Sequence, residues 1–156
     1  MLERTDGEQG VELEYVANCG MLIQGAGKKL LFDGIHTVRR PPFSPIPEMM
    51  VERILKNQDE FTDLGWLLFS HRHIDHCDPR MLSHYENPHT RILLPGPAGW
   101  TPPGEIICPL EILPDAPAGP LVFQDGPLTI PAVRTPPGGP HGLETWQCYH
   151  PVVVGG

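Results

Sequence analysis

The stretch Gly65–Pro79 reads GWLLFSHRHIDHCDP, and it decides how the rest of the chain is interpreted. Its first half, WLLF, is a short and continuously apolar run of the kind expected for a β-strand buried on both faces. Three histidines and two aspartates then follow within the ten residues Ser70–Pro79. A polar cluster at the end of a buried strand is far more specific than a histidine-rich surface loop, and it indicates a metal-binding turn.

The spacing of the polar residues indicates how they would bind a metal ion. His71 and His73 are separated by one residue, so on extended backbone both imidazoles point to the same side. Asp75 and His76 come after the chain has begun to turn, which makes them a second, neighbouring pair. Imidazole and carboxylate groups are ligands that zinc, manganese(II) and iron(II) accept. Asp78 is expected to cap a following helix, to accept a hydrogen bond from a ligating imidazole, or to do both.

The residues before the cluster predict an antiparallel β-meander. Val11–Val16 alternates apolar and polar side chains, and the runs MLIQG (21–25) and KKLLFDG (28–34) follow after closely spaced turns. The third strand delivers Asp33 at its tip. A Pro-rich loop then leads into PEMMVERILKNQ (47–58), which predicts a short amphipathic helix with Pro47 at its first position.

The residues after the cluster predict a second short helix and further strands. The helix is expected in RMLSHYE (80–86), capped by Asp78 with Pro79 at its first position. Strands are expected in TRILLPG (90–96), LVFQ (121–124), PLTIPAV (127–133) and TWQCYHPVVV (145–154). Strands that alternate with two short helices indicate an α+β or α/β layered domain with a mixed sheet.

Bulk composition limits the class of protein. The 156 residues fit one domain, and the 20 prolines and 17 glycines predict many turns. A net charge of −8 argues against nucleic-acid binding. The first ten residues carry no apolar secretory signal and no run is long enough to span a membrane, so a cytoplasmic location is expected. The four cysteines form no CxxC pair and are interpreted as reduced thiols.

The stretch HRHIDH has the form HxHxDH, and it resembles the motif of the metallo-β-lactamase superfamily of metal-dependent hydrolases. The context is similar too, because a β-meander, an aspartate at a strand tip in LLFDG, a helix and a buried strand precede the motif. The resemblance implies an αβ/βα sandwich that binds one or two zinc ions, with manganese or iron(II) as alternatives.

The resemblance also implies roles for individual residues. His71 and His73 correspond to ligands of the first metal, and Asp75 and His76 to ligands of the second. A third ligand of the first metal is expected from a later loop, where His141 is favoured over His150. Asp33 corresponds to an aspartate beside the metal site. The implied reaction is metal-assisted hydrolysis of a small ester, lactone, amide or phosphodiester, in which Asp75 orients the nucleophile and accepts protons.

The sequence departs from the superfamily pattern in its length. Residues 1–156 are interpreted as a single metallo-β-lactamase-like domain that lacks the C-terminal half, with its bridging aspartate and last histidine. An incomplete sandwich would leave an apolar sheet face exposed, so self-association is expected beside binding of a small-molecule substrate. Two alternatives to the hydrolase stay open, namely a catalytically weak or inactive metal-binding or interaction module, and a redox protein that holds iron in the same ligands.

Overall fold

The computed structural model describes residues 10–97, 99–114, 119–134, 146–148 and 152–153. Its main element is a six-stranded sheet in the order β1-β2-β3-β4-β5-β6. The bounds of these strands are β1 Glu12–Tyr15, β2 Met21–Gly25, β3 Lys28–Phe32, β4 Trp66–Leu68, β5 Arg91–Pro95 and β6 Leu110–Leu113. Strands β1 to β3 form the expected antiparallel meander. Strands β3 to β6 are all parallel, so the sheet is mixed.

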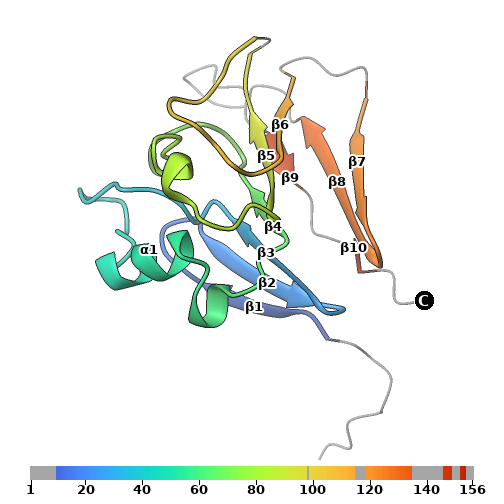
Figure 1. Ribbon diagram of the computed structural model, residues 1–156, viewed down its shortest axis with the longest axis horizontal. Coiled ribbons are helices and arrows are strands. Elements are labelled where there is room, and N and C mark those ends of the chain that lie inside the picture. The colour runs from blue at the N-terminus through green and yellow to red at the C-terminus, as the bar shows by residue number, and fades with distance from the viewer. Residues whose placement is uncertain (1–9, 98, 115–118, 135–145, 149–151, 154–156) are drawn as a thin grey trace, which may run out of the picture.

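A second, smaller sheet packs on one face of the first. It contains β7 (Leu121–Asp125), β8 (Leu128–Arg134) and β10 (Val152–Val153) in the order β10-β8-β7, and β9 (Trp146–Cys148) also pairs with β8. All of these pairs are antiparallel. The single α-helix of the described residues, α1 (Glu48–Leu55), lies on the other side of the main sheet (Figure 1). The molecule therefore has a helix layer, a mixed sheet and a second sheet.

Two apolar clusters hold these layers together. Strand β4 contributes to both, as the uninterrupted run WLLF predicts: Leu67 faces the helix side, whereas Trp66 and Leu68 face the second sheet. All three are at most 2% exposed. Ile54 anchors α1 in the first cluster, and Ile130 of β8 packs in the second. Burial of β4 from both sides fixes the place where the histidine cluster begins.

Two details of the predicted helices are corrected. Pro47 precedes α1 as its N-cap residue and is not its first helical residue. The predicted helix in RMLSHYE is a four-residue 3₁₀ helix, η2 (Met81–His84), with Arg80 at its N-cap. It is short because the chain turns extended at Tyr85, whose buried hydroxyl bonds Thr90 at 2.9 Å. A second 3₁₀ turn, η1 (Asp59–Phe61), follows α1.

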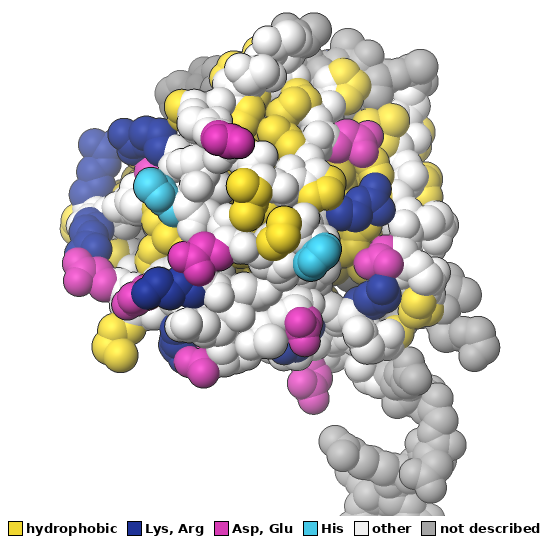
Figure 2. All heavy atoms as spheres, in the orientation of Figure 1, with side chains coloured by type: hydrophobic (Ala, Val, Ile, Leu, Met, Phe, Trp, Pro, Cys, Tyr) yellow, Lys and Arg dark blue, Asp and Glu magenta, His cyan; other side chains and the backbone are white. Residues whose placement is uncertain are grey.

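The surface mixes both signs of charge. Figure 2 shows Lys and Arg side chains interspersed with Asp and Glu on one face, with apolar side chains between them. Edge strand β1 is exposed along its whole length, and Leu13 and Tyr15 are each 58% exposed. Within the part of the chain that the structure describes, no helix has the length and apolar character that a membrane crossing requires.

Candidate metal centre

The histidine cluster lies where two parallel strands end side by side. β3 and β4 pair in parallel register up to Phe32 and Leu68, so the residues after them meet at one edge of the sheet. The backbone N–H of Asp33 donates to the carbonyl of Leu68 at 2.9 Å. Asp33 has a φ of 46°, a left-handed conformation that Asp adopts more readily than most residues. This turn directs its carboxylate toward Ser70.

A tight turn brings the end of the motif back over its beginning. The N–H groups of His76 and Cys77 donate to the carbonyl of His73 at 2.9 and 2.8 Å. As a result the rings of His71 and His76 lie with their centroids 4.0 Å apart, and those of His71 and His73 are 4.5 Å apart. The two pairs that the sequence separates, His71 with His73 and Asp75 with His76, thus form one contiguous cluster.

The buried carboxylate of Asp33 holds this cluster in place through hydrogen bonds. Asp33 is 1% exposed, and its Oδ1 accepts the backbone N–H of Ser70 at 2.7 Å. Its Oδ2 accepts the Ser70 hydroxyl at 2.6 Å and bonds His76 Nδ1 at 2.8 Å. Ser70 Oγ in turn lies 2.9 Å from His71 Nδ1. Asp33 therefore positions His76 directly and His71 through Ser70.

This network assigns the tautomers of two histidines. The carboxylate of Asp33 only accepts hydrogen bonds, so Nδ1 of His76 carries the proton that it donates. The Ser70 hydroxyl has a single proton, which it gives to Asp33, so its oxygen accepts a hydrogen bond from Nδ1 of His71. In the neutral form of each ring, the Nε2 atom then keeps its lone pair. A carboxylate that fixes an imidazole in this way is the usual support of a metal ligand.

Electrostatics act differently on the two rings. Burial, followed by the neighbouring His76 and His73, lowers the pKa of His71 to about 4, so this imidazole is neutral at pH 7. Burial also lowers the pKa of His76, but the hydrogen bond and charge of Asp33, together with the charge of Asp75, outweigh it and raise the pKa overall. A cation near the cluster would meet one neutral imidazole and a second one polarised by a carboxylate.

The outer side of the cluster is open to solvent. His73 is exposed, and its Nδ1 lies 3.0 Å from His71 Nε2. Asp75 and His76 are each 16% exposed, with Asp75 Oδ2 at 3.3 Å from His76 Nε2. Asn18, in the turn between β1 and β2, donates to the backbone carbonyl of Asp75 at 2.8 Å. The pairs His71 with His73 and Asp75 with His76 therefore present candidate metal-binding nitrogen and oxygen atoms on the solvent side.

The residue types fit a divalent metal ion. Lone pairs on His71 Nε2 and His76 Nε2, the ring of His73 and the carboxylate of Asp75 are the nitrogen and oxygen donors that zinc, iron(II) and manganese(II) take. Within the described ranges, no group of three or more His, Cys, Asp or Glu side chains is already arranged to hold one ion. The structure thus shows pairs of candidate metal ligands and the hydrogen bonds that hold the imidazoles in place.

The remaining predicted site residues are His141, with its alternative His150, and Asp78. His141 and His150 fall outside the described residues, so the third ligand of the first metal stays a prediction. Asp78 accepts hydrogen bonds from Thr37 at 2.8 Å and from the backbone N–H of Arg80 at 3.1 Å, and it pairs with the Arg80 guanidinium. The expected capping role of Asp78 is wrong, because η2 begins at Met81 with Arg80 as its N-cap residue and without a side-chain cap hydrogen bond. The partners of Asp78 in the structure are thus Thr37 and Arg80.

Three residues of the site were not predicted from the sequence. Ser70 and Asn18 looked like ordinary polar residues at a strand end and in a turn, and neither carries a recognisable signal. The sequence would make His36 an ordinary hydrogen-bonded histidine, whereas its buried ring nitrogens have no hydrogen-bond partner among the described residues. The spacing of DGIH, which places His36 three residues after the strand-tip Asp33, was the available signal. Cys77 is fully buried, and burial raises the pKa of its thiol, as expected for an inert cysteine.

Comparison with known proteins identifies the fold. No family model and no curated protein sequence matches the chain. Among solved structures, the crystal structure of CmlA, a diiron β-hydroxylase from Streptomyces venezuelae, is similar with a TM-score of 0.50 and 19% identity over 91% of this chain. A point mutant of the CmlA β-hydroxylase gives a TM-score of 0.49 and 19% identity over 92%. The chain spans 28% and 29% of the lengths of these two structures.

The architecture is a partial metallo-β-lactamase-type fold. The mixed six-stranded sheet, the single α-helix and the second sheet correspond to the α+β sandwich expected from the sequence. At 19% identity the similarity describes the fold alone. The fold places the histidine cluster at the carboxyl ends of parallel strands, where α/β sheets commonly carry their sites.

Proposed function

We propose that the protein is a metal-dependent hydrolase that binds zinc through His71, His73, Asp75 and His76 and acts on a small ester, lactone, amide or phosphodiester. The observation that carries the proposal is the network from Asp33 through Ser70. It engages the Nδ1 atoms of His71 and His76, so that in the neutral rings both Nε2 lone pairs are free and lie within one cluster. His141 is proposed as a further ligand of the first metal.

A bound divalent ion would supply a Lewis acid that polarises the substrate and lowers the pKa of water. The chain's own residues would provide the rest. Asp33 holds the orientation of His76 and, through Ser70, that of His71. Asp75, anchored by Asn18, is the carboxylate placed to orient the nucleophile and to accept its proton. The exposed position of His73 leaves the cluster open to a small substrate.

The test combines metal content with turnover. Purified protein is loaded with zinc or manganese, its bound metal is measured, and hydrolysis of a generic ester, lactam and phosphodiester is followed. We expect bound metal and turnover that are both lost in His71→Ala but kept in His89→Ala, whose side chain is exposed and outside the cluster. Turnover no higher than that of His71→Ala would refute the hydrolase. Bound metal without turnover would support the alternative, a non-catalytic metal-binding module.

Iron is the second candidate metal, because the similar solved structure is that of a diiron β-hydroxylase. The donors of the cluster accept iron(II) as well as zinc. An iron-dependent redox function would appear as iron in the protein purified without added metal, together with activity that requires oxygen. Zinc in the purified protein and oxygen-independent hydrolysis would favour the hydrolase.

A further inference from the structure

His36 is a buried histidine that the proposed chemistry does not yet use. Its side chain is 1% exposed, and neither ring nitrogen has a hydrogen-bond partner among the described residues. A buried polar atom without a partner lowers stability, so each such atom in a folded protein requires an explanation. An aliphatic or aromatic side chain would pack in this position without that cost. The histidine therefore points to a ligand as its partner.

The backbone fixes His36 beside the metal cluster. Ile35 forms a parallel bridge with Cys77, and the N–H of Asp78 donates to the carbonyl of Ile35 at 2.8 Å. The segment that carries His36 thus runs alongside the end of the motif that carries Asp75 and His76. Burial lowers the pKa of His36. The charge of Asp75 raises it and that of His76 lowers it, and the net shift is downward. Its imidazole is accordingly neutral, the form that binds a metal.

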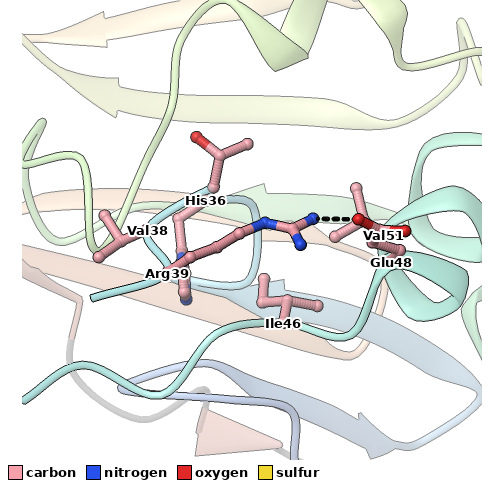
Figure 3. A pocket seen from close by; sticks show the side chains of 7 residues that line it. His36, Val38, Arg39, Ile46, Glu48 and Val51 are labelled. Atoms are coloured by element: carbon pink, nitrogen blue, oxygen red, sulfur yellow. Dashed lines mark ion pairs between the residues drawn. The ribbon is translucent and has the colours of Figure 1, made fainter. Parts of the chain in front are cut away.

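His36 is one of the residues that line a small pocket. Figure 3 shows the residue on the wall of a pocket of about 110 Å³, together with Val38, Arg39, Ile46, Glu48 and Val51. Arg39 and Glu48 are paired with each other at 2.7 Å, so their charges are already matched. The protein is therefore not closely packed around the whole of this residue.

We propose that His36 is a ligand of the metal centre and binds on the side of Asp75 and His76. This inference rests on the proposed metal centre and adds a donor to it. Asp75 Oδ2 and His76 Nε2 lie 3.3 Å apart and give only two metal ligands. Two protein ligands are too few for a stable zinc site. With His36 the set becomes two imidazoles and one carboxylate. Three protein ligands and one open position are the usual arrangement of a catalytic zinc ion.

The test is zinc binding by the full chain, measured by competition with a chromophoric chelator and by bound zinc per chain. The variant His36→Phe replaces the imidazole with an apolar ring of similar size, and His84→Phe makes the same change at an exposed histidine in η2. We expect His36→Phe to lose at least about tenfold in zinc affinity, as metal sites do when a group that positions or binds the ion is removed. His84→Phe is expected to bind zinc as the wild type does.

The metal-free stability of the same variants separates a ligand from a packing residue. Without metal, His36→Phe should unfold at the same urea concentration as the wild type or a higher one, because two unpaired buried nitrogens are removed. His36→Gln, which keeps a polar side chain, should show the same loss of zinc affinity if the phenylalanine is not tolerated. Wild-type zinc affinity in both variants would overturn the inference. A wild-type protein that binds no zinc would overturn the proposed metal centre itself, and the inference with it.

Discussion

At the scale of single residues, the site depends on Ser70 as much as on the histidines. Its hydroxyl oxygen lies between Asp33 Oδ2 at 2.6 Å and His71 Nδ1 at 2.9 Å. The carboxylate reaches His71 only through this side chain, whereas it bonds His76 directly. Ser70 thereby determines which nitrogen of His71 is free to bind a cation.

Ser70→Ala is expected to lower zinc affinity by about 10- to 100-fold, since it removes the support of one ligand and leaves the ligand itself in place. Zinc competition measures the change. Ser83→Ala is the matched control, because the Ser83 hydroxyl donates to the backbone carbonyl of Arg80, the N-cap residue of η2, and not to the cluster. Equal affinities of the Ser70 and Ser83 variants would show that the relay has no role in metal binding.

Asp33→Asn is expected to destabilise the metal-free protein by about 1–3 kcal/mol, because the amide cannot accept all three hydrogen bonds that the carboxylate accepts. Asn tolerates the left-handed φ of 46°, so the substitution changes the carboxylate without straining the backbone. Asp63→Asn is the control, as Asp63 has a φ of 60° but is exposed. The measurement is urea unfolding, and equal midpoints for both variants would contradict the expectation.

At the scale of elements, the second sheet is tied to the first by its turn as well as by apolar packing. Asp125, at the end of β7, pairs with Lys28 of β3 at 2.7 Å and accepts a hydrogen bond from the Trp66 indole of β4 at 3.0 Å. Trp66 also packs edge-on against Phe123 of β7, with centroids 6.2 Å apart. These contacts set the β7–β8 hairpin over the parallel strands.

The hydrogen bond of Lys28 lowers the pKa of Asp125, and that of Trp66 lowers it further. A carboxyl whose pKa is lower in the folded state stabilises the protein above its unfolded pKa, and this contribution is lost as pH falls through the folded value. Asp125→Asn should therefore cost up to about 1 kcal/mol at pH 7, because the pair is partly exposed. The cost should shrink as pH falls below the ordinary Asp value of 3.8 and disappear only below the lower pKa of the folded state. Urea unfolding across this range tests it, and a cost independent of pH would contradict it.

At the scale of the whole molecule, the second sheet covers the main sheet unevenly. Leu13 pairs with Ile23 across the β1–β2 ladder, and Ile23 packs at the border of the cluster between the sheets. Leu13 and Tyr15 extend the same face of the main sheet to its edge strand β1, and each is 58% exposed. We propose that the protein self-associates through this face. Glu12 and Glu14, which alternate with them, oppose simple edge-to-edge pairing of β1.

A double substitution, Leu13→Lys with Tyr15→Lys, should weaken self-association by about tenfold or more, since two lysines would have to be desolvated in the interface. Sedimentation velocity over a range of protein concentrations measures it. Met49→Lys is the control, because Met49 is 78% exposed on α1 and thus on the opposite layer. A wild-type chain that stays monomeric at all concentrations would refute the interface.

The sequence by itself determined the meander, the buried strand β4 and the residue types of the cluster, because period-2 alternation, a continuous apolar run and His/Asp spacing are local signals. It did not reveal that Ser70 connects Asp33 to His71, that Asn18 holds Asp75, or that His36 is buried with no hydrogen-bond partner in the part of the chain that the structure describes. Those contacts join residues up to 57 positions apart, and they arise from the parallel pairing of β3 with β4 and the bridge from Ile35 to Cys77. The sequence supplies the donors, whereas the tertiary structure decides which nitrogen of each ring is free, since that depends on groups that only folding brings within hydrogen-bond distance.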